Sequence, residues 1–268
     1  MGTFGSGVQA PEGARRNSAP GQQGSGGRGR RRDPLRWPGR GPAQGVQGAG
    51  LVVTGAVFSG KVNVGDILTL SPSGTEVRVR GIHSQNRKTE TGIAGERCAI
   101  NITGADLKSS AVKRGGWLLT PQIHAPVPRF DAILKVLPNE KKPLRHWMPV
   151  HIHAGAAEIP GRIAVLGQKE IAAGSEGLVQ VVLDRRIGIL RDDHFIVRDQ
   201  SAQRTIAGGK VVDPFSPSRG RAKPVRIKFL EDMMISEPDH ALSCLLKNNP
   251  EGVDLRQFSI AWNLTQED

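Results

Sequence analysis

The feature that most restricts the fold of this chain is a series of short apolar runs that starts at Gly48 and continues to about residue 214. The runs are rich in β-branched residues, and most are bounded by Gly, Pro or Asp, which is typical of strands and tight turns. Val77–Ile82 alternates apolar and basic residues, as a half-exposed strand does. Because no long helical periodicity separates the runs, the pattern predicts consecutive antiparallel β-barrels.

A stiff segment divides these runs into two groups. Pro121–Pro128 contains three prolines and no glycine, so it predicts a rigid connection between two barrels. We expect one barrel over 47–121 and a second over 127–214, followed by a basic linker over 215–224. The fold class is therefore mainly β, with a helical segment after the barrels.

The C-terminal segment, 225–268, changes to helical spacing. VRIKFLEDMMI and PDHALSCLLKN carry apolar residues at helical intervals, and a third helix begins at Asp254. Thr265 then starts a further N-cap. This is the layout of a winged helix that is cut off where its recognition helix would begin.

The opening segment, 1–46, has a different composition. The first fifty residues hold 14 of the 34 glycines and eight arginines but only two acidic residues. Such a sequence cannot bury enough apolar surface to offset the entropy of ordering, so it predicts disorder. Three interpretations compete: an Arg/Gly-rich RNA-binding tail, a targeting peptide without an amphipathic face, or a misassigned start.

The string Gly55–Val62 (GAVFSGKV) spells G-x-x-x-x-G-K, the phosphate-binding loop of nucleotide-binding proteins. Such a loop needs a following helix whose N-terminus faces the phosphates, and a Ser or Thr hydroxyl for magnesium. Here Gly60-Lys61 leads into Val-Asn-Val-Gly, and Val62 has no hydroxyl. The string is therefore interpreted as part of a β-hairpin.

The charge distribution favours a polyanionic partner. Of the formal net charge of +12, much lies in the predicted barrels, where residues 51–214 hold 22 basic and 15 acidic groups. A basic folded region suits RNA, while the alternative is a basic domain without such a partner. No apolar run approaches the roughly 18–20 residues of a membrane span. Cys98 and Cys244 are isolated, which argues against disulfides and structural zinc and favours a reducing cytoplasm.

Several stretches resemble the translation GTPases. GAGLVVTGAVFSGKVNVGDILTL, followed by GERCAINITG and VKRGGWLLTP, is similar to the second domain of elongation factor Tu and its relatives. DDHFIVRDQSAQRTIAGGKVVDP is similar to the last strands of their third domain. VRGIHSQNRKTETGIAGERCAIN, RHWMPVHIHAGAAEIPGRIAVL and SPSRGRAKP most resemble the selenocysteine-specific elongation factors. The resemblance covers about residues 47–268.

In that family a GTP-binding domain comes first and uses GTP and magnesium. No credible phosphate loop, D-x-x-G or N-K-x-D motif stands in this sequence, so we expect a fragment without that domain, with no enzymatic activity and no cofactor of its own. The family also has an Asp-Arg pair about nine residues before G-x-G-x-V-V-T-G. The matching positions are Gly41 and Pro42, and this departure favours the interpretation of 1–46 as a misassigned start.

The resemblance implies a cytoplasmic protein that binds selenocysteyl-tRNA and the ribosome. It reaches the insertion hairpin in mRNA only through C-terminal domains absent from this sequence. The family's second domain holds the aminoacyl end and distinguishes an ionised selenol from a serine hydroxyl. A partly buried guanidinium suits that task because it keeps its charge. The matching arginine is Arg97, whose other interpretation is an ordinary strand-end arginine paired with Glu96. His83 could line the same face or be a surface loop histidine.

The third domain in such factors touches the tRNA stem, which makes several cations weak candidates for phosphate contacts. They are Arg162, Arg198, Arg204, Lys210, Arg219 and Arg221. For each residue alone, a solvated surface charge is the favoured interpretation, and the same holds for Lys223 and Arg226 of the basic run.

Two rivals remain open. One is the barrel pair of another translation GTPase that binds ordinary aminoacyl-tRNA. The other is a metallohydrolase centred on His151 and His153, which alternate on one face of a strand. It would need a third ligand such as Glu158 or His146, and structural or RNA-facing histidines are the favoured interpretation.

Overall fold

The computed structural model describes residues 35–38, 44–46, 50–108 and 112–264, which belong to one compact unit. The described part is mainly β, as predicted, with all strand pairs antiparallel. None of its helices is long and apolar enough to cross a membrane.

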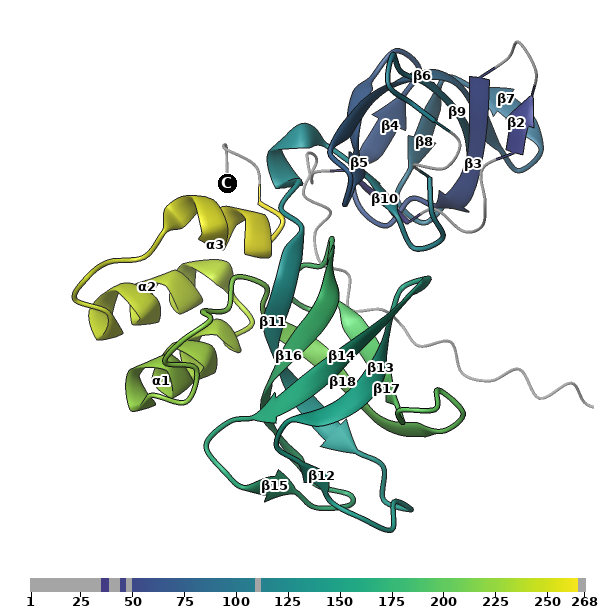
Figure 1. Cartoon of the computed structure of the whole chain (residues 1–268). Coiled ribbons are helices and arrows are strands. Elements are labelled where there is room, and N and C mark those ends of the chain that lie inside the picture. The colour runs from purple at the N-terminus through teal and green to yellow at the C-terminus, as the bar shows by residue number, and fades with distance from the viewer. Residues whose placement is uncertain (1–34, 39–43, 47–49, 109–111, 265–268) are drawn as a thin grey trace, which may run out of the picture. The chain divides into compact units, whose positions relative to one another are not determined.

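Eight strands form the first sheet, in the order β1-β10-β5-β6-β9-β3-β2 with β7 beside β6. They are β1 (Arg36–Pro38), β2 (Gln44–Val46), β3 (Gly50–Ala56), β5 (Ile67–Ser71), β6 (Thr75–Ser84), β7 (Arg87–Thr89), β9 (Arg97–Thr103) and β10 (Trp117–Leu119). The hydrogen-bonded path does not close among the described residues, because β4 (Lys61–Asn63) and β8 (Thr91–Ile93) pair separately. Val62 of β4 nevertheless packs in the same core, so this small sheet covers the same interior (Figure 1).

Alternation decides which residues of this sheet face the core. On β9, Cys98, Ile100 and Ile102 are buried, so the residues between them face outward. On β6 the pairing register shifts between Val79 and Gly81, so the next side chain after Val79 that faces the core is that of Ile82 instead of residue 81. The alternation predicted for Val77–Ile82 is thus confirmed up to this bulge.

The second group of strands closes into a barrel in the order β11-β16-β14-β13-β17-β18. Its strands are β11 (Val127–Val136), β13 (Met148–Ala154), β14 (Ala157–Val165), β16 (Glu176–Ile187), β17 (His194–Arg198) and β18 (Thr205–Asp213). A separate pair, β12 (Leu144–Arg145) with β15 (Glu170–Ile171), lies outside this ring. The one-turn 3-10 helix Pro121–Ile123 precedes β11 and matches the stiff connection expected from its prolines.

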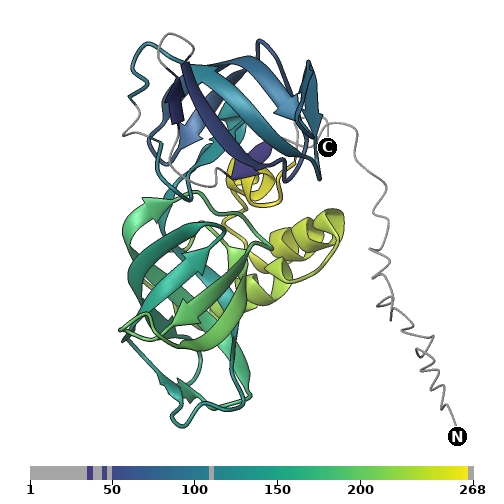
Figure 2. The ribbon, with the colours of Figure 1, turned by 90° about the vertical axis from the view of Figure 1, so that its right-hand side faces the viewer.

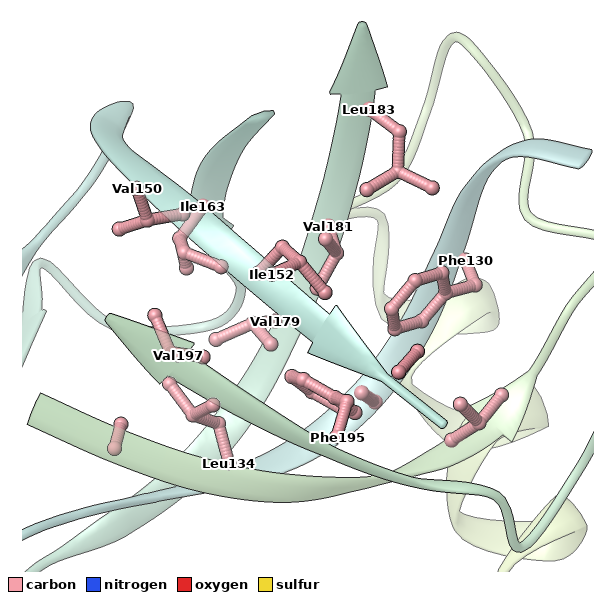
Figure 3. Close-up of a cluster of buried hydrophobic side chains, with 14 of the residues drawn as sticks. Phe130, Leu134, Val150, Ile152, Ile163, Val179, Val181, Leu183, Phe195 and Val197 are labelled. Atoms are coloured by element: carbon pink, nitrogen blue, oxygen red, sulfur yellow. The ribbon is translucent and has the colours of Figure 1, made fainter. Parts of the chain in front are cut away.

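The closed barrel is filled by aliphatic and aromatic side chains from all six strands. Figure 3 shows Phe130, Ile152, Val181 and Phe195 in its interior. Phe130 and Phe195 meet edge to face, with ring centroids 5.2 Å apart and an interplanar angle of 74°. Gly209 is required beside them, because a Cβ there would lie 2.6 Å from the carbonyl oxygen of Ile133. Burial of this apolar surface is the main stabilising contribution of the barrel.

Two strands fall inside the segment for which composition predicts disorder. β1 pairs with β10 and β2 pairs with β3. Leu35 is buried in the core of the first sheet, and its backbone N–H donates to Thr120 Oγ1 at 2.9 Å. The prediction of disorder is therefore wrong for residues 35–38 and 44–46, because pairing with a neighbouring sheet satisfies their backbone groups. Gly41 and Pro42 lie outside the described residues.

The phosphate-loop string joins two strands, as expected, but not as a hairpin, because β3 pairs with β2 and β9 whereas β4 pairs with β8. Gly60 has a φ of 69°, and Lys61 begins strand β4 instead of a helix. Val62 is fully buried. The described residues of this string therefore do not fit GTP and magnesium, because neither a helix N-terminus nor a hydroxyl is in place.

Three helices follow the barrel: α1 (Pro224–Met233), α2 (Pro238–Asn248) and α3 (Leu255–Ala261). Pro224 and Pro238 stand in the first turns, and the Asp254 side chain accepts a hydrogen bond from Gln257 N–H at 3.0 Å as an N-cap. Figures 1 and 2 show the helices grouped together. Leu230, Leu245 and Phe258 share one cluster with Leu166 and Val212 of the barrel region. The N-cap expected at Thr265 lies outside the described residues.

A buried charge cluster attaches α1 to the barrel. Arg226 Nη2 lies 2.5 Å from Asp131 Oδ2 on β11 and 2.6 Å from Asp213 Oδ2 on β18. Gln180 Nε2 donates to Asp131 Oδ1 at 3.0 Å and to the carbonyl of Pro217 at 3.0 Å. Arg226, named in the sequence as part of a basic run that could face RNA, is therefore a buried structural residue.

Two carboxylates share one guanidinium here, and this has a consequence for pH dependence. Burial raises the pKa of Asp131 from 3.8 to about 6, although the Arg226 guanidinium opposes the shift. Between about pH 4 and pH 6 the folded state therefore holds a proton that the unfolded state has lost. The stability contributed by this group is fully present below about pH 4 and is lost as the pH rises through 6.

We expect the free energy of unfolding to fall more steeply between pH 4 and pH 6 in the wild-type chain than in Asp131→Asn, by at most roughly 1.4 kcal/mol per pH unit. Asparagine imitates the protonated acid, so the variant has no proton to lose at this position. Urea denaturation at a series of pH values measures both slopes. Parallel pH profiles for the two proteins would contradict the assignment.

Candidate functional site

Arg97 lies at the start of β9, with Ala56 of β3 as its Cα partner. Its side chain is exposed and makes no hydrogen bond or ion pair with any described residue. Glu96 does not pair with it, because Glu96 Oε2 accepts a hydrogen bond from Ile93 N–H at 3.0 Å. The expectation of a partly buried guanidinium is therefore not met within the described residues, and the cation is available to an external anion.

His83 lies on the adjacent strand β6, opposite Ala99 of β9. Since Ala99 follows Arg97 by two residues, His83 and Arg97 are diagonal neighbours on the same outward face, a spacing of about 7–8 Å between Cα atoms. His83 is exposed and also pairs with Lys88 of the short strand β7. The register thus brings together the two residues named for the aminoacyl end, with a lysine beside them.

Among the six cations named for tRNA contacts, Arg204 and Lys210 form ion pairs, and Arg198 donates to a backbone carbonyl. Arg204 Nη1 lies 2.5 Å from Glu140 Oε1, and Lys210 Nζ lies 2.9 Å from Asp192 Oδ1. Arg198 Nη2 donates to the carbonyl of Gln203 at 2.9 Å. Internal ion pairs lower the net charge that Arg204 and Lys210 present, so these two are weaker candidates for phosphate contacts than the sequence suggests.

Two of the other three cations contact an exposed tryptophan that the sequence did not single out. Arg162 Nη1 donates to the Trp147 carbonyl at 3.4 Å, and the Arg221 guanidinium carbon lies 5.5 Å from the Trp147 ring centroid. Arg219 is exposed two residues before Arg221. No periodic pattern marks Trp147, since it stands in a turn. The only signal in the sequence is the presence of a large aromatic residue at a turn position.

The histidine pair of β13 does not form a metal centre among the described residues. His153 stands opposite Glu158, and His151 Nδ1 lies 3.2 Å from Glu158 Oε1. His146 Nδ1 instead lies 3.2 Å from the Val165 carbonyl. The described residues contain no group of three His, Cys, Asp or Glu side chains that could hold a metal ion. The metallohydrolase interpretation therefore has no support in this geometry.

A cavity of about 400 Å³ lies beside β12 and β13. Val136, Leu144, Met148 and Ile206 line its apolar part, while Glu140, Lys141, Lys142 and Arg204 supply charges. Arg97 and His83 are not among the residues that line it. The aminoacyl-end residues named from the sequence therefore occupy an open face.

Two domain families match the chain. Residues 50–119 match elongation factor Tu domain 2, and residues 131–218 match the beta-barrel domain of selenocysteine-specific elongation factors. The two matches follow each other along the chain, in the order of the two groups of strands.

Relatives agree with these matches. The chain is 37% identical over 223 residues to the selenocysteine-specific elongation factor of Escherichia coli K12, and this alignment covers 83% of this chain and 34% of that protein. It is 38% identical over 192 residues to the corresponding factor of Haemophilus influenzae, and this alignment covers 72% of this chain and 30% of that protein. The chain thus spans about a third of the length of these curated relatives.

Solved structures show the same fold. A bacterial selenocysteine-specific elongation factor EF-Sec superposes with a TM-score of 0.67 at 27% identity, covering 88% of this chain and 36% of that one. Apo elongation factor SelB from Methanococcus maripaludis has a TM-score of 0.58 at 23% identity, and the superposition covers 70% of this chain and 44% of that chain. Domain matches, relatives and fold agree: the chain belongs to the family of selenocysteine-specific elongation factors.

Proposed function

We propose that this chain is the tRNA-binding part of a cytoplasmic factor that delivers selenocysteyl-tRNA to the ribosome. The relatives named for selenocysteine support the substrate, and the basic barrel region supports a polyanionic partner. GTP and magnesium belong to the GTP-binding domain of such factors. The string Gly55–Val62 does not fit them, because Lys61 begins a strand and Val62 has no hydroxyl.

The observation that carries the proposal is the guanidinium of Arg97 on the outward face of β9, which no described residue pairs with. A selenol is ionised at neutral pH, whereas a serine hydroxyl is not. A cation without a protein partner gains Coulomb energy from the selenolate, and this gain increases as the bound aminoacyl end excludes water. Because Arg97 is exposed, the ligand itself must supply that exclusion of water. His83 and Lys88 on the neighbouring strands add positive or hydrogen-bonding groups to the same region.

The test compares the wild-type chain with Arg97→Ala in retaining selenocysteyl-tRNA and seryl-tRNA. We expect the wild type to hold selenocysteyl-tRNA more tightly, and Arg97→Ala to lose this preference, a change on the order of a few kcal/mol. Binding of seryl-tRNA should weaken only slightly, through the loss of one positive charge that attracts phosphates, because its hydroxyl carries no charge for Arg97 to meet. Filter retention of each labelled tRNA measures both affinities.

Arg114→Ala is the matched control, because Arg114 is also exposed and its loss changes the net charge equally. The Arg114→Ala substitution should lower the affinity for both tRNAs equally, because it removes only a general attraction to the phosphates. Equal retention of both tRNAs by the intact chain would instead favour the other candidate, a barrel pair that binds ordinary aminoacyl-tRNA. The family match makes that candidate the less favoured of the two.

A further inference from the structure

Trp147 occupies a position in the fold that does not suit a large side chain. It lies in the turn between β12 and β13 with a φ of 66°, a conformation that favours Gly, Asn or Asp. Its side chain is 43% exposed, so the ring does not fill the core of the barrel. A bulky residue held in this backbone region and facing solvent is a reason to look for a ligand.

The backbone on both sides of the ring is fixed. Trp147 N–H donates to the Ile163 carbonyl at 2.6 Å, and Arg162 Nη1 donates to the Trp147 carbonyl at 3.4 Å. The His146 ring lies 6.2 Å from the indole at an interplanar angle of 27°. The indole is therefore presented on a strand junction rather than on a free loop, and its orientation is largely set before any ligand arrives.

Two arginines contact Trp147, Arg221 at the ring and Arg162 at the backbone carbonyl. The Arg221 guanidinium lies 5.5 Å from the ring centroid, and Arg219 stands exposed on the same linker. On the barrel, Arg162 lies beside Pro149, and Arg198 follows on β17 opposite His151. Glu158 of β14 lies against His151, and Glu170 of β15 pairs with Arg145.

We propose that Trp147 and Arg221 form a stacking platform for an unpaired nucleotide of single-stranded RNA. An indole face accepts any base by stacking, while flexible arginines beside it pair with the phosphates. The surrounding cations favour this occupant over an apolar peptide, which would gain nothing from them. The inference rests on the proposed function only in taking RNA as the partner, and it concerns a site separate from Arg97.

The experiment is a fluorescence titration of the whole chain with an adenosine oligonucleotide of about ten residues. Stacking of a base on the indole should quench tryptophan emission. A blunt-ended RNA duplex of the same length is the second probe, since its paired bases are not free to stack. Neither probe carries an amino acid, so the result is independent of the selenocysteine test.

Trp147→Asn removes the ring with a residue that tolerates the same backbone conformation. We expect it to abolish the quenching and to weaken binding of the oligonucleotide about tenfold, with the duplex unaffected. Arg221→Gln should weaken binding at low salt and have less effect at high salt, because its contribution is electrostatic. Arg145→Gln is the matched control for charge, since Arg145 is exposed and pairs with Glu170 instead.

Equal affinity of Trp147→Asn and the wild type for the oligonucleotide would overturn the proposal. Equal quenching by the duplex would do the same, because it would show contact without stacking. Wild-type self-association that Trp147→Asn abolishes, without quenching by either RNA, would assign the ring to a protein contact and also refute it.

Discussion

Replacing Arg226 with alanine is expected to lower the free energy of unfolding by about 3–5 kcal/mol. This is the largest stability loss expected for any substitution of a charged residue in this chain. The guanidinium is the cation between Asp131 and Asp213, and the Asp131 side chain is fully buried. Its removal leaves two carboxylates facing each other away from water. The mutation also detaches α1 from the barrel, so the cluster of helices should lose packing against Val212 and Leu166.

Urea denaturation followed by circular dichroism measures this loss. Arg256→Ala is the matched control, because Arg256 is an exposed arginine of α3 and its loss should cost less than about 1 kcal/mol. Arg226→Lys should fall between the two, since a single ammonium cannot reproduce the planar, multiply donating contact with both acids. An Arg226→Ala protein as stable as Arg256→Ala would show that the cluster contributes nothing in solution.

Replacing Arg36 with methionine is expected to destabilise the chain by about 2–4 kcal/mol. Arg36 Nη1 and Nη2 contact the two carboxylate oxygens of Asp193 at 2.9 and 2.6 Å. The guanidinium carbon also lies 4.6 Å from the Trp117 ring centroid, and the Arg36 side chain is 7% exposed. Methionine keeps much of the packing volume but leaves Asp193 without its cation.

The same mutation tests whether strand β1 contributes to the folded chain. The structure joins Arg36 to a residue 157 positions away, so loss of this contact should destabilise more than the segment itself. Arg114→Met should leave stability nearly unchanged, because Arg114 is exposed. If Arg36→Met behaved like Arg114→Met in thermal unfolding, strand β1 would have no role in the folded chain.

Much of the fold followed from local patterns. β-branched runs bounded by Gly and Pro predicted the antiparallel strands, and period-2 alternation predicted which residues of β6 face the core up to the bulge after Val79. Helical spacing predicted α1 and α2 close to their observed bounds. The prediction of disorder was wrong for β1 and β2. Composition indicates only how much apolar surface a segment can bury by itself, whereas these two strands pair with β10 and β3.

The candidate site was predicted less completely. Arg97 and His83 were named from a family resemblance, and the pairing of β6 with β9 places them on one outward face. The partial burial expected for Arg97 was not found, because the burial of a strand-end residue depends on the segments packed over it and not on the pattern of the strand itself. Trp147 was missed, since a single tryptophan in a turn has no periodic signal.

Repeated local patterns and family motifs were enough to predict the class of fold and the family. The role of each charge, in contrast, depended on the folded arrangement of distant residues. Arg221 and Arg226 belong to one basic run, yet Arg221 lies against an exposed indole and Arg226 is held by two buried carboxylates. The physical reason is that the energy of a charge depends on its solvation and on partners such as Asp131, 95 residues away, which no local pattern specifies.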